Sequence, residues 1–467
     1  MEKLKKGIVS VFIANFINMI ISILTNFVLP KFLSIDTYSY IKTYQLYIGM
    51  IGILHLGYVD GMFLKYGGKE LIDINMKDLN KNLSTFRIFQ ILITIIVIAF
   101  AVLFTHEYVY LAISLVIVPL NMASYFKSLY QSIGEFKRYS RLMNTTTVVT
   151  FIANFALLFG IKTDKYEWYL TSYVVINFVI WIILEVYFEK SCRYKFKILI
   201  FSFKEFLNNI KDGILLMLGN FGNSLLSSID RWFVKGLLDS NAFAQYSFAC
   251  SMETMVNVAV TPITVTLYNY FCKNPSKHNI IVIRNSLIIL AAFLIACAFP
   301  AKFILEVYLT QYLSSSKILF CLFGAQLFYI VIKSVYVNLY KAMHQQKKYF
   351  VKLVSVIIIG IILNIICFYI VHTKEAFAIG TLLSAAIWFI FSVYDFKEYS
   401  LGFKPVIYII MCLTIFLICG YTLNAILGFL VYMILSFLFT MLFLRKEFKY
   451  LVHYGKNLFH IHRKTKL

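Results

Sequence analysis

Ionisable side chains lie inside the apolar stretches of this sequence. A segment that faces only lipid would carry none. The stretch SSIDRWFVKG, residues 227–236, sets Asp230 directly beside Arg231. Glu253 and Lys333 lie well inside two later apolar runs. A charge at the centre of a bilayer costs about 2.5–3.5 kcal/mol on insertion scales. Charges kept at that cost indicate a function: the cations suit anionic groups, and the carboxylates suit a proton or a sodium ion.

Amide and hydroxyl side chains accompany these charges on two of the apolar runs. They recur every three or four residues, so on a helix they share one face. Such a face must turn to protein or water, and its donors and acceptors match those of sugar hydroxyls. The candidate residues are Asn15 and Asn18 in the first run and Asn220, Asn223, Ser224 and Ser227 in a later one.

Ion coupling or gating is the second role that we assign to residues here. The candidates are His55, Asp60 and Lys65 together with Asp230 and Glu253. Alternatives stay open for several of them. His55 is either a packed neutral imidazole or a proton carrier, and Asp60 with Lys65 forms either a surface pair or a gate. Arg231 either neutralises an acid such as Glu253 or lines a cavity.

The positions of these residues require a scaffold of membrane helices. Of 467 residues, 60% are hydrophobic and 14% are charged, which leaves too little polar surface for a soluble protein of this length. The apolar runs are about 20 residues long, as membrane-spanning helices are, rather than alternating ten-residue strands. The fold class is therefore all-α, a polytopic bundle of about fourteen transmembrane helices. Predicted spans used below cover residues 7–29, 44–64, 213–238, 242–271, 406–419 and 425–444.

Charge sets the orientation. The net charge of +22 reflects the collection of Lys and Arg in cytoplasmic loops, so we expect no nucleic-acid partner. Basic residues crowd alternate loops and the tail, which places both termini in the cytoplasm. The eight cysteines are scattered and predict neither a disulfide nor a metal site. We expect no cofactor and no catalytic residue.

A weak internal repeat divides the chain. Asn15, Asn18 and Ser22 recur as Asn220, Asn223 and Ser227, a displacement of 205 positions. Six spans per copy give both copies the same orientation, which is a parallel repeat about an axis along the membrane normal. We expect an N-terminal lobe over 1–205, a second six-helix lobe over 206–400, and two further helices with a basic cytoplasmic tail over 401–467. An aqueous cavity is expected between the two lobes.

Two stretches resemble a known family. LGYVDGMFLKYGGKE (56–70) and SIDRWFVKGLLDSNAFAQYSFACS (228–251) are similar to Wzx-like polysaccharide flippases of the multidrug/oligosaccharidyl-lipid/polysaccharide (MOP) exporter superfamily. The resemblance implies alternating access that carries an undecaprenyl-diphosphate-linked oligosaccharide, an O-antigen or capsule repeat unit, across the bacterial cytoplasmic membrane. It also implies membrane lipids and a polysaccharide polymerase with chain-length machinery as partners. Arg231 and Lys333 would then attract the diphosphate, and a gradient of H⁺ or Na⁺ would drive transport.

Three alternatives compete with this interpretation. A multidrug or cation antiporter of the same superfamily needs acids and aromatic residues more than deep cations. A lipid II flippase would handle the same diphosphate. A multi-pass polysaccharide polymerase needs a large outward loop, and no predicted loop is long enough. We therefore expect a transporter rather than an enzyme.

Overall fold

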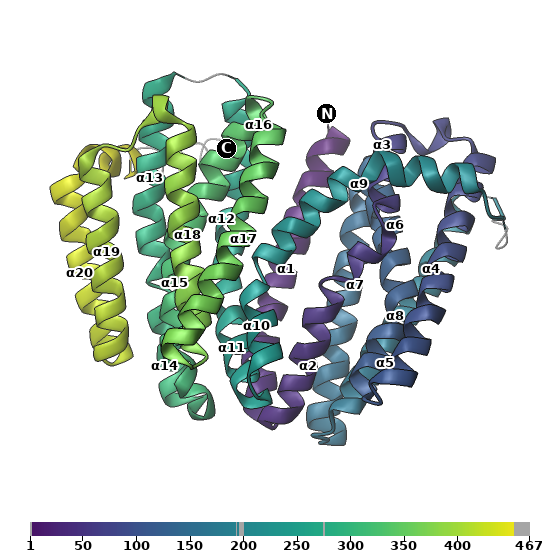
Figure 1. Cartoon of the computed structure of the whole chain (residues 1–467). Helices are drawn as coiled ribbons and strands as arrows, with labels where there is room; N and C mark the ends of the chain where they lie inside the picture. Colours follow the sequence, from purple (N-terminus) through teal and green to yellow (C-terminus); the bar gives the residue numbers. More distant parts are fainter. Residues whose placement is uncertain (1, 193, 196–199, 274–275, 453–467) are drawn as a thin grey trace, which may run out of the picture. The chain divides into compact units, whose positions relative to one another are not determined.

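The computed structural model describes residues 2–192, 194–195, 200–273 and 276–452. Helices make up almost all of these residues, and no strand occurs among them (Figure 1). This confirms the all-α fold class. The chain divides into two compact units, residues 1–228 and 229–467. The predicted division at 205 and 400 rests on the repeat, and it stays a prediction.

The first unit is formed by twelve helical elements in the described residues. They are α1 (Glu2–Phe32), α2 (Ile35–Ile48), η1 (Ile51–His55), α3 (Tyr58–Tyr66), η2 (Leu71–Asp73), α4 (Met76–Phe104), α5 (Tyr108–Leu115), α6 (Ile117–Ser132), α7 (Phe136–Phe155), η3 (Ala156–Ile161), α8 (Tyr166–Cys192) and α9 (Phe203–Leu226).

The second unit is formed by fourteen helical elements in the described residues. Its described elements are α10 (Ile229–Leu237), α11 (Ser240–Thr254), α12 (Val256–Phe271), α13 (Lys277–Ile295), α14 (Ala298–Val307), η4 (Thr310–Ser315), α15 (Ser316–Val331), η5 (Ile332–Tyr336), α16 (Val337–Ala342), α17 (Gln346–Val371), α18 (Glu375–Asp395), η6 (Lys397–Tyr399), α19 (Phe403–Thr422) and α20 (Ala425–Phe443).

Membrane-crossing length is reached by fewer helices than the sequence predicts. Among the described residues, ten helical segments are long and apolar enough to span a membrane, and eleven if the bent pair Ile35–His55 and Tyr58–Tyr66 counts as one. The three predicted spans without a counterpart among them are 7–29, 213–238 and 242–271. All three carry the polar residues singled out above, so the count of about fourteen is approximate.

Several predicted spans are broken rather than continuous. The span predicted over 44–64 begins earlier, at α2, and bends by 61° before α3; Leu56 (φ 49°) and Gly57 (φ 84°) form the corner. The span predicted over 213–238 is interrupted at Ser227 and Ser228, between α9 and α10. The structure thus corrects the interpretation of SSIDRWFVKG as the end of one long helix.

A close helix crossing holds α9 in the first unit. A methyl group on Gly213 would lie 2.0 Å from the carbonyl oxygen of Gly57 and 2.2 Å from the nitrogen of Gly61. Gly57 and Gly61 are four residues apart, so they lie on one face of α3 and let the two backbones touch. Buried Tyr58, Met62 and other apolar side chains continue the core around this contact.

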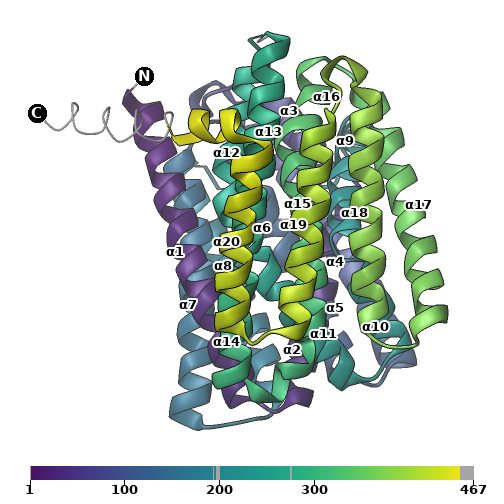
Figure 2. The same ribbon diagram turned by 90° about the vertical axis from the view of Figure 1, so that its left-hand side faces the viewer.

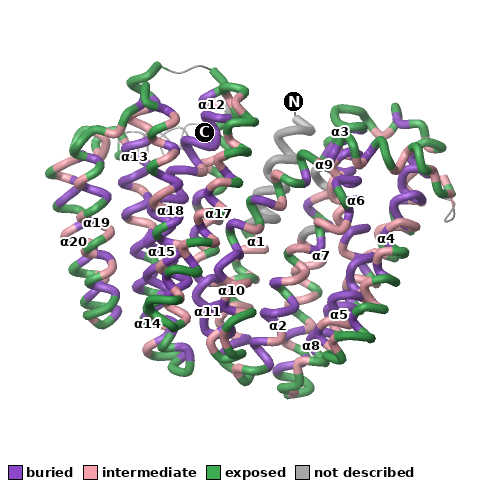
Figure 3. Tube along the Cα trace, in the orientation of Figure 1, coloured by how far each residue is buried: buried purple, intermediate pink, exposed green. Residues whose placement is uncertain are grey.

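The second unit is built around α15. Every residue of this helix from Ile318 to Val331 is buried (Figure 3). It contacts α11, α13, α18 and α19, as expected for a helix that is apolar on nearly all sides. The wider turn η5 is a π-helix that follows α15 directly and carries Lys333.

The two C-terminal helices are tied to α14. Figure 2 shows α19 and α20 side by side, and only Leu423 and Asn424 separate the two helices in the sequence. Lys302 Nζ donates to the carbonyl oxygens of Gly420 (2.9 Å) and Leu423 (2.6 Å). A cation at the carboxyl end of a helix also matches the helix dipole.

Candidate functional site

Asp230 is a fully satisfied carboxylate at the start of α10. Only 5% of the residue is exposed, because α10 packs against α11, α17 and α18. Its Oδ2 accepts from Tyr246 Oη of α11 (2.7 Å) and from Thr381 Oγ1 of α18 (3.4 Å). Its Oδ1 accepts from the backbone nitrogen of Arg231 (2.8 Å). Asp230 therefore joins three helices and fixes the position of Arg231.

Glu253 lies among the other charged groups of the second unit. It is half-buried in the last turn of α11 and accepts a hydrogen bond from Nε2 of Gln326, which is buried on α15. Glu253 also interacts electrostatically with Lys333, Asp230 and Arg231. The structure thus brings four of the predicted site residues into one charge cluster. Two of them are cations and two are acids.

Lys333 is held by an aromatic surface in this cluster. Its Nζ lies 5.3 Å from the centre of the Tyr329 ring, within cation–π range. The Tyr329 ring in turn contacts Trp388 of α18 edge-on, with 6.0 Å between centroids. The π-turn η5 carries Lys333, and π-turns inside α-helices are frequent at functional sites. The half-buried ammonium thus lies between an aromatic ring and the Glu253 side chain.

The polar stripe predicted on residues 220–227 belongs to the first unit, since α9 packs with α3 and α4. Asn220, Asn223, Ser224 and Ser227 are all exposed. Asn223 Nδ2 donates to the carbonyl of Gly219, and Ser227 Oγ donates to that of Asn223, both at 2.9 Å. These bonds to the preceding turn favour a bend in a helix, and α9 ends at this point.

Asp60 meets partners from two elements of the first unit. Its Oδ1 accepts from Asn220 Nδ2 (3.3 Å), and its Oδ2 lies 3.9 Å from His55 Nε2. His55 Nδ1 accepts from the backbone nitrogen of Gly57 (3.2 Å), so the neutral ring carries its proton on Nε2, toward Asp60. Asp60, His55 and Asn220 therefore form a second small polar cluster.

Two further predicted residues of the first unit, Asn15 and Asn18, lie on α1. Asn18 is half-buried on this helix. Asn15 is part of α1 as well, but its side chain lies outside the described residues.

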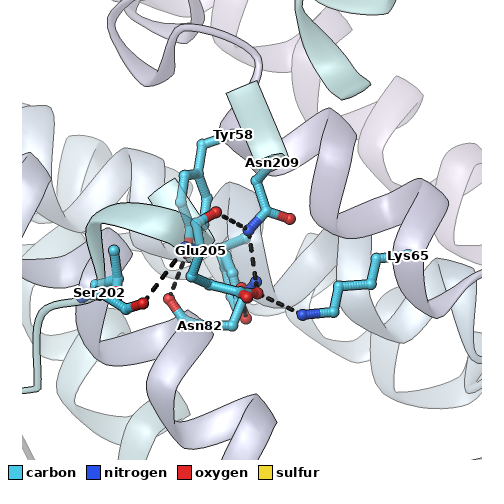
Figure 4. Close-up of polar contacts among 8 residues, drawn as sticks. Tyr58, Lys65, Asn82, Ser202, Glu205 and Asn209 are labelled. Atoms are coloured by element: carbon cyan, nitrogen blue, oxygen red, sulfur yellow. Dashed lines mark hydrogen bonds and ion pairs between the residues drawn. The ribbon is translucent and has the colours of Figure 1, made fainter. Parts of the chain in front are cut away.

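Lys65 forms its ion pair with Glu205 at the start of α9 (Figure 4). Glu205 also accepts from Asn82 Nδ2 (2.6 Å) and Asn209 Nδ2 (3.2 Å). Ser202 caps the same helix end by accepting from the Glu205 nitrogen. The structure pairs Lys65 with Glu205 rather than with Asp60. This ion pair anchors α9 to α3, and the bond from Asn82 to Glu205 anchors it to α4.

Electrostatics favour an ionised Glu205. This residue precedes the apolar part of α9 and lies outside the membrane-spanning segments. Burial works to raise the pKa of Glu205, but the hydrogen bonds from Lys65, Asn82 and Asn209 outweigh burial and hold the pKa below its usual value. The anchor is therefore charged at neutral pH.

Sequence reasoning missed the uncharged partners of the cluster and the anchor of α9. Tyr246 and Thr381 carry no motif, since their role arises only when α10, α11 and α18 meet. Asn82 is fully buried, but it lies in the polar stretch KDLNKNLST that precedes the next apolar run, so no sequence signal singled it out. No group of three or more His, Cys, Asp or Glu residues suited to a metal ion occurs in the part of the chain that the structure describes.

Known structures share this fold. Lipid II flippase MurJ in an inward closed conformation aligns with a TM-score of 0.60 and 14% identity over 96% of this chain and 99% of that one. A MOP superfamily transporter from Pyrococcus furiosus aligns with a TM-score of 0.50 and 13% identity over 85% and 96%. A multidrug resistance MATE family transporter in an inward-facing conformation gives 0.51 and 10% over 83% and 95%. The fold is that of MOP-superfamily transporters.

The family follows from the sequence itself. Residues 4–275, more than half of the chain, match the polysaccharide biosynthesis protein family, and the protein belongs to this family. No curated protein matches the chain.

Proposed function

We propose that this protein is a flippase for undecaprenyl-diphosphate-linked oligosaccharide repeat units in surface polysaccharide biosynthesis. In this proposal Arg231 and Lys333 bind the diphosphate. Asn15, Asn18, Asn220, Asn223, Ser224 and Ser227 bind the sugars. Alternating access between two lobes moves the glycan across the bacterial cytoplasmic membrane, with both chain termini in the cytoplasm and a polysaccharide polymerase receiving the product.

One observation carries this proposal: two half-buried cations, Arg231 and Lys333, share a cluster with Glu253 inside the second unit. A guanidinium can bind two oxygens of a diphosphate at once, and an ammonium attracts the diphosphate as a point charge. The Glu253 side chain interacts with both cations, which offsets part of the cost of holding them in the unit. Membership in the polysaccharide biosynthesis family supports the glycan part of the cargo.

The acids supply the coupling step in this proposal. Asp60, Asp230 and Glu253 are the carboxylates able to take a proton or a sodium ion, with His55 beside Asp60. Asp230 already has three donors, whereas the hydrogen bond of Glu253 comes from a neutral amide. We therefore assign coupling to Glu253 before Asp230.

Arg231→Ala in the source strain tests the proposal. Removing one charge-assisted contact costs about 1.5–3 kcal/mol, so substrate binding should weaken roughly 10- to 150-fold. Surface polysaccharide should disappear and lipid-linked repeat units should accumulate, at unchanged protein abundance. Lys235→Ala is the matched control, because Lys235 lies one turn on, over the Phe243 ring. Normal surface polysaccharide in the Arg231→Ala strain would refute the assignment.

A binding assay separates the cargo classes. Purified protein should bind farnesyl diphosphate, and Arg231→Ala and Lys333→Ala should each weaken that binding. Lipid II shares the diphosphate and differs in its glycan, so competition by lipid II at equal affinity would favour a lipid II flippase. Tight binding of cationic drugs in place of farnesyl diphosphate would favour the multidrug antiporter.

A further inference from the structure

A cavity lies between α6, α7 and α8 of the first unit, away from all the residues discussed so far. Its volume is about 160 Å³, and its lining includes Tyr130, Arg138, Arg141, Thr145, Ile183 and Tyr187. Two arginines and two tyrosines thus share a small cavity with aliphatic side chains. A packed helix interface has no need of that combination.

The polar end of this cavity holds two buried polar atoms that lack a hydrogen bond of normal geometry. The Arg138 guanidinium lies over the rings of Tyr130 (5.8 Å) and Tyr187 (5.7 Å), and its Nε is 3.5 Å from the Glu135 carboxylate. Arg138 Nη1 and Tyr130 Oη are buried, and among the described residues neither makes a hydrogen bond of normal length and angle, although the two side chains interact with each other. Buried polar atoms are rarely left in this state. Arg138 Nη1 can only donate and Tyr130 Oη can donate as well as accept, so an oxygen of an anionic ligand would satisfy both.

The apolar end runs into the membrane-spanning part of α8. Ile180 is buried against the cavity, while Ile183 is 58% exposed. Candidate spans cover Arg138–Ile161 and Tyr166–Cys192, so Arg138 begins one span and Tyr187 lies near the end of the next. Arg and Tyr at span ends lie at headgroup depth, and the aliphatic residues lie deeper. The cavity therefore changes from polar at headgroup depth to apolar deeper in the membrane, as a lipid molecule does.

We propose that this cavity binds the phosphodiester headgroup of an anionic glycerophospholipid, with an acyl chain along Ile183. The charges of Arg138 and Arg141 less that of Glu135 leave one net positive charge, which matches one phosphodiester rather than a diphosphate. Basic pockets between transmembrane helices bind such headgroups in general. The proposal is independent of the substrate that the protein transports.

Delipidated protein in detergent, titrated with phosphatidylglycerol or phosphatidylcholine and followed by native mass spectrometry, tests this site. Phosphatidylglycerol should bind at least tenfold more tightly than phosphatidylcholine. Arg141→Ala should weaken phosphatidylglycerol binding about tenfold, because Arg141 is exposed and its loss leaves the core intact. Thr145→Trp should do the same by filling the cavity while keeping both arginines. Lys190→Ala, an exposed cation at the end of α8, should change nothing.

Three results would overturn the proposal. Equal affinity for phosphatidylglycerol and phosphatidylcholine would show that the net charge of the headgroup does not contribute to binding. Unchanged phosphatidylglycerol binding in both Arg141→Ala and Thr145→Trp would place the lipid elsewhere. Displacement of phosphatidylglycerol from the wild-type protein by farnesyl diphosphate, lost in Arg141→Ala, would assign the cavity to a polyprenyl diphosphate. Since Arg231 is intact in these variants, the result does not depend on the proposed transport function.

Discussion

The close crossing of α3 and α9 predicts that a single added methyl group at Gly213 destabilises the protein. In Gly213→Ala the new carbon would lie 2.0 Å from the Gly57 oxygen and 2.2 Å from the Gly61 nitrogen. Non-bonded carbon atoms rest about 3.5–4.0 Å apart. The two helices must therefore separate by more than about 1 Å, since both contacts are backbone atoms that cannot rotate away.

The size of the effect follows from two opposing terms. Overpacking typically costs about 1–3 kcal/mol, and rigid backbone neighbours place this site at the upper end. Alanine recovers about 1 kcal/mol through its higher helix propensity. We expect a net loss of about 2 kcal/mol for Gly213→Ala. Gly219→Ala on the same helix meets nothing within 4 Å, so it should be neutral or stabilising by up to about 1 kcal/mol.

Denaturant titration of both variants in detergent micelles measures this difference directly. The free energies of unfolding should differ by about 2–3 kcal/mol between two chemically identical changes on α9. Equal unfolding curves for Gly213→Ala and Gly219→Ala would show that the helices are not in backbone contact. In that case the position of the Asn220–Asp60 contact would also have to be reconsidered.

Three further outcomes are expected. Thermal stability should fall as pH drops below about 4.5, the ordinary pKa of the Glu205 carboxyl. The pKa of Glu205 is lower in the folded state, so its stabilisation is complete above that pH and is lost as the group protonates; Glu205→Gln should flatten the profile, and an unchanged pH profile would contradict the anchor. In a cysteine-free background, a water-soluble maleimide should label Ser224→Cys, which is exposed, and spare Ser334→Cys, which is fully buried; equal labelling of the two would argue against a wet stripe. Arg87→Ala should cost about 3 kcal/mol because Glu185 loses two bonds of 3.0 Å, whereas replacing both residues by Leu should recover most of that loss in denaturant titrations.

Hydropathy was sufficient for the fold class and for most of the spans, because lipid-facing helices need nothing more than length and apolar character. It was least informative for the segments 7–29, 213–238 and 242–271, which carry more polar side chains than a lipid-facing helix does. The break at Ser227 and Ser228 arises from packing, since α9 and α10 bury their apolar faces in different units. A continuous apolar pattern cannot reveal that change of partner.

The charge cluster was predictable residue by residue but not in its connections. Helical periodicity selected Glu253 and Lys333 individually. The hydrogen bonds of Asp230 to Tyr246 and Thr381 depend on which faces of α10, α11 and α18 meet, and one sequence does not contain that information. The spacing of Gly57 and Gly61, by contrast, is a local signal for a close helix crossing.

The π-turn at η5 changes how this stretch of sequence should be counted. The π-turn Ile332–Tyr336 contains one residue more than the same length of α-helix would. The α-helical segments on its two sides are therefore oriented relative to each other as they would be in a continuous α-helix with one residue fewer. Tyr336 and Tyr340 consequently behave as though they were numbered one lower, which moves them about 100° from the face that a count of 3.6 residues per turn assigns. A structural alignment with any relative that lacks the turn requires a single-residue gap within this pentapeptide, and an ungapped alignment would misplace Lys333 or every position that follows it.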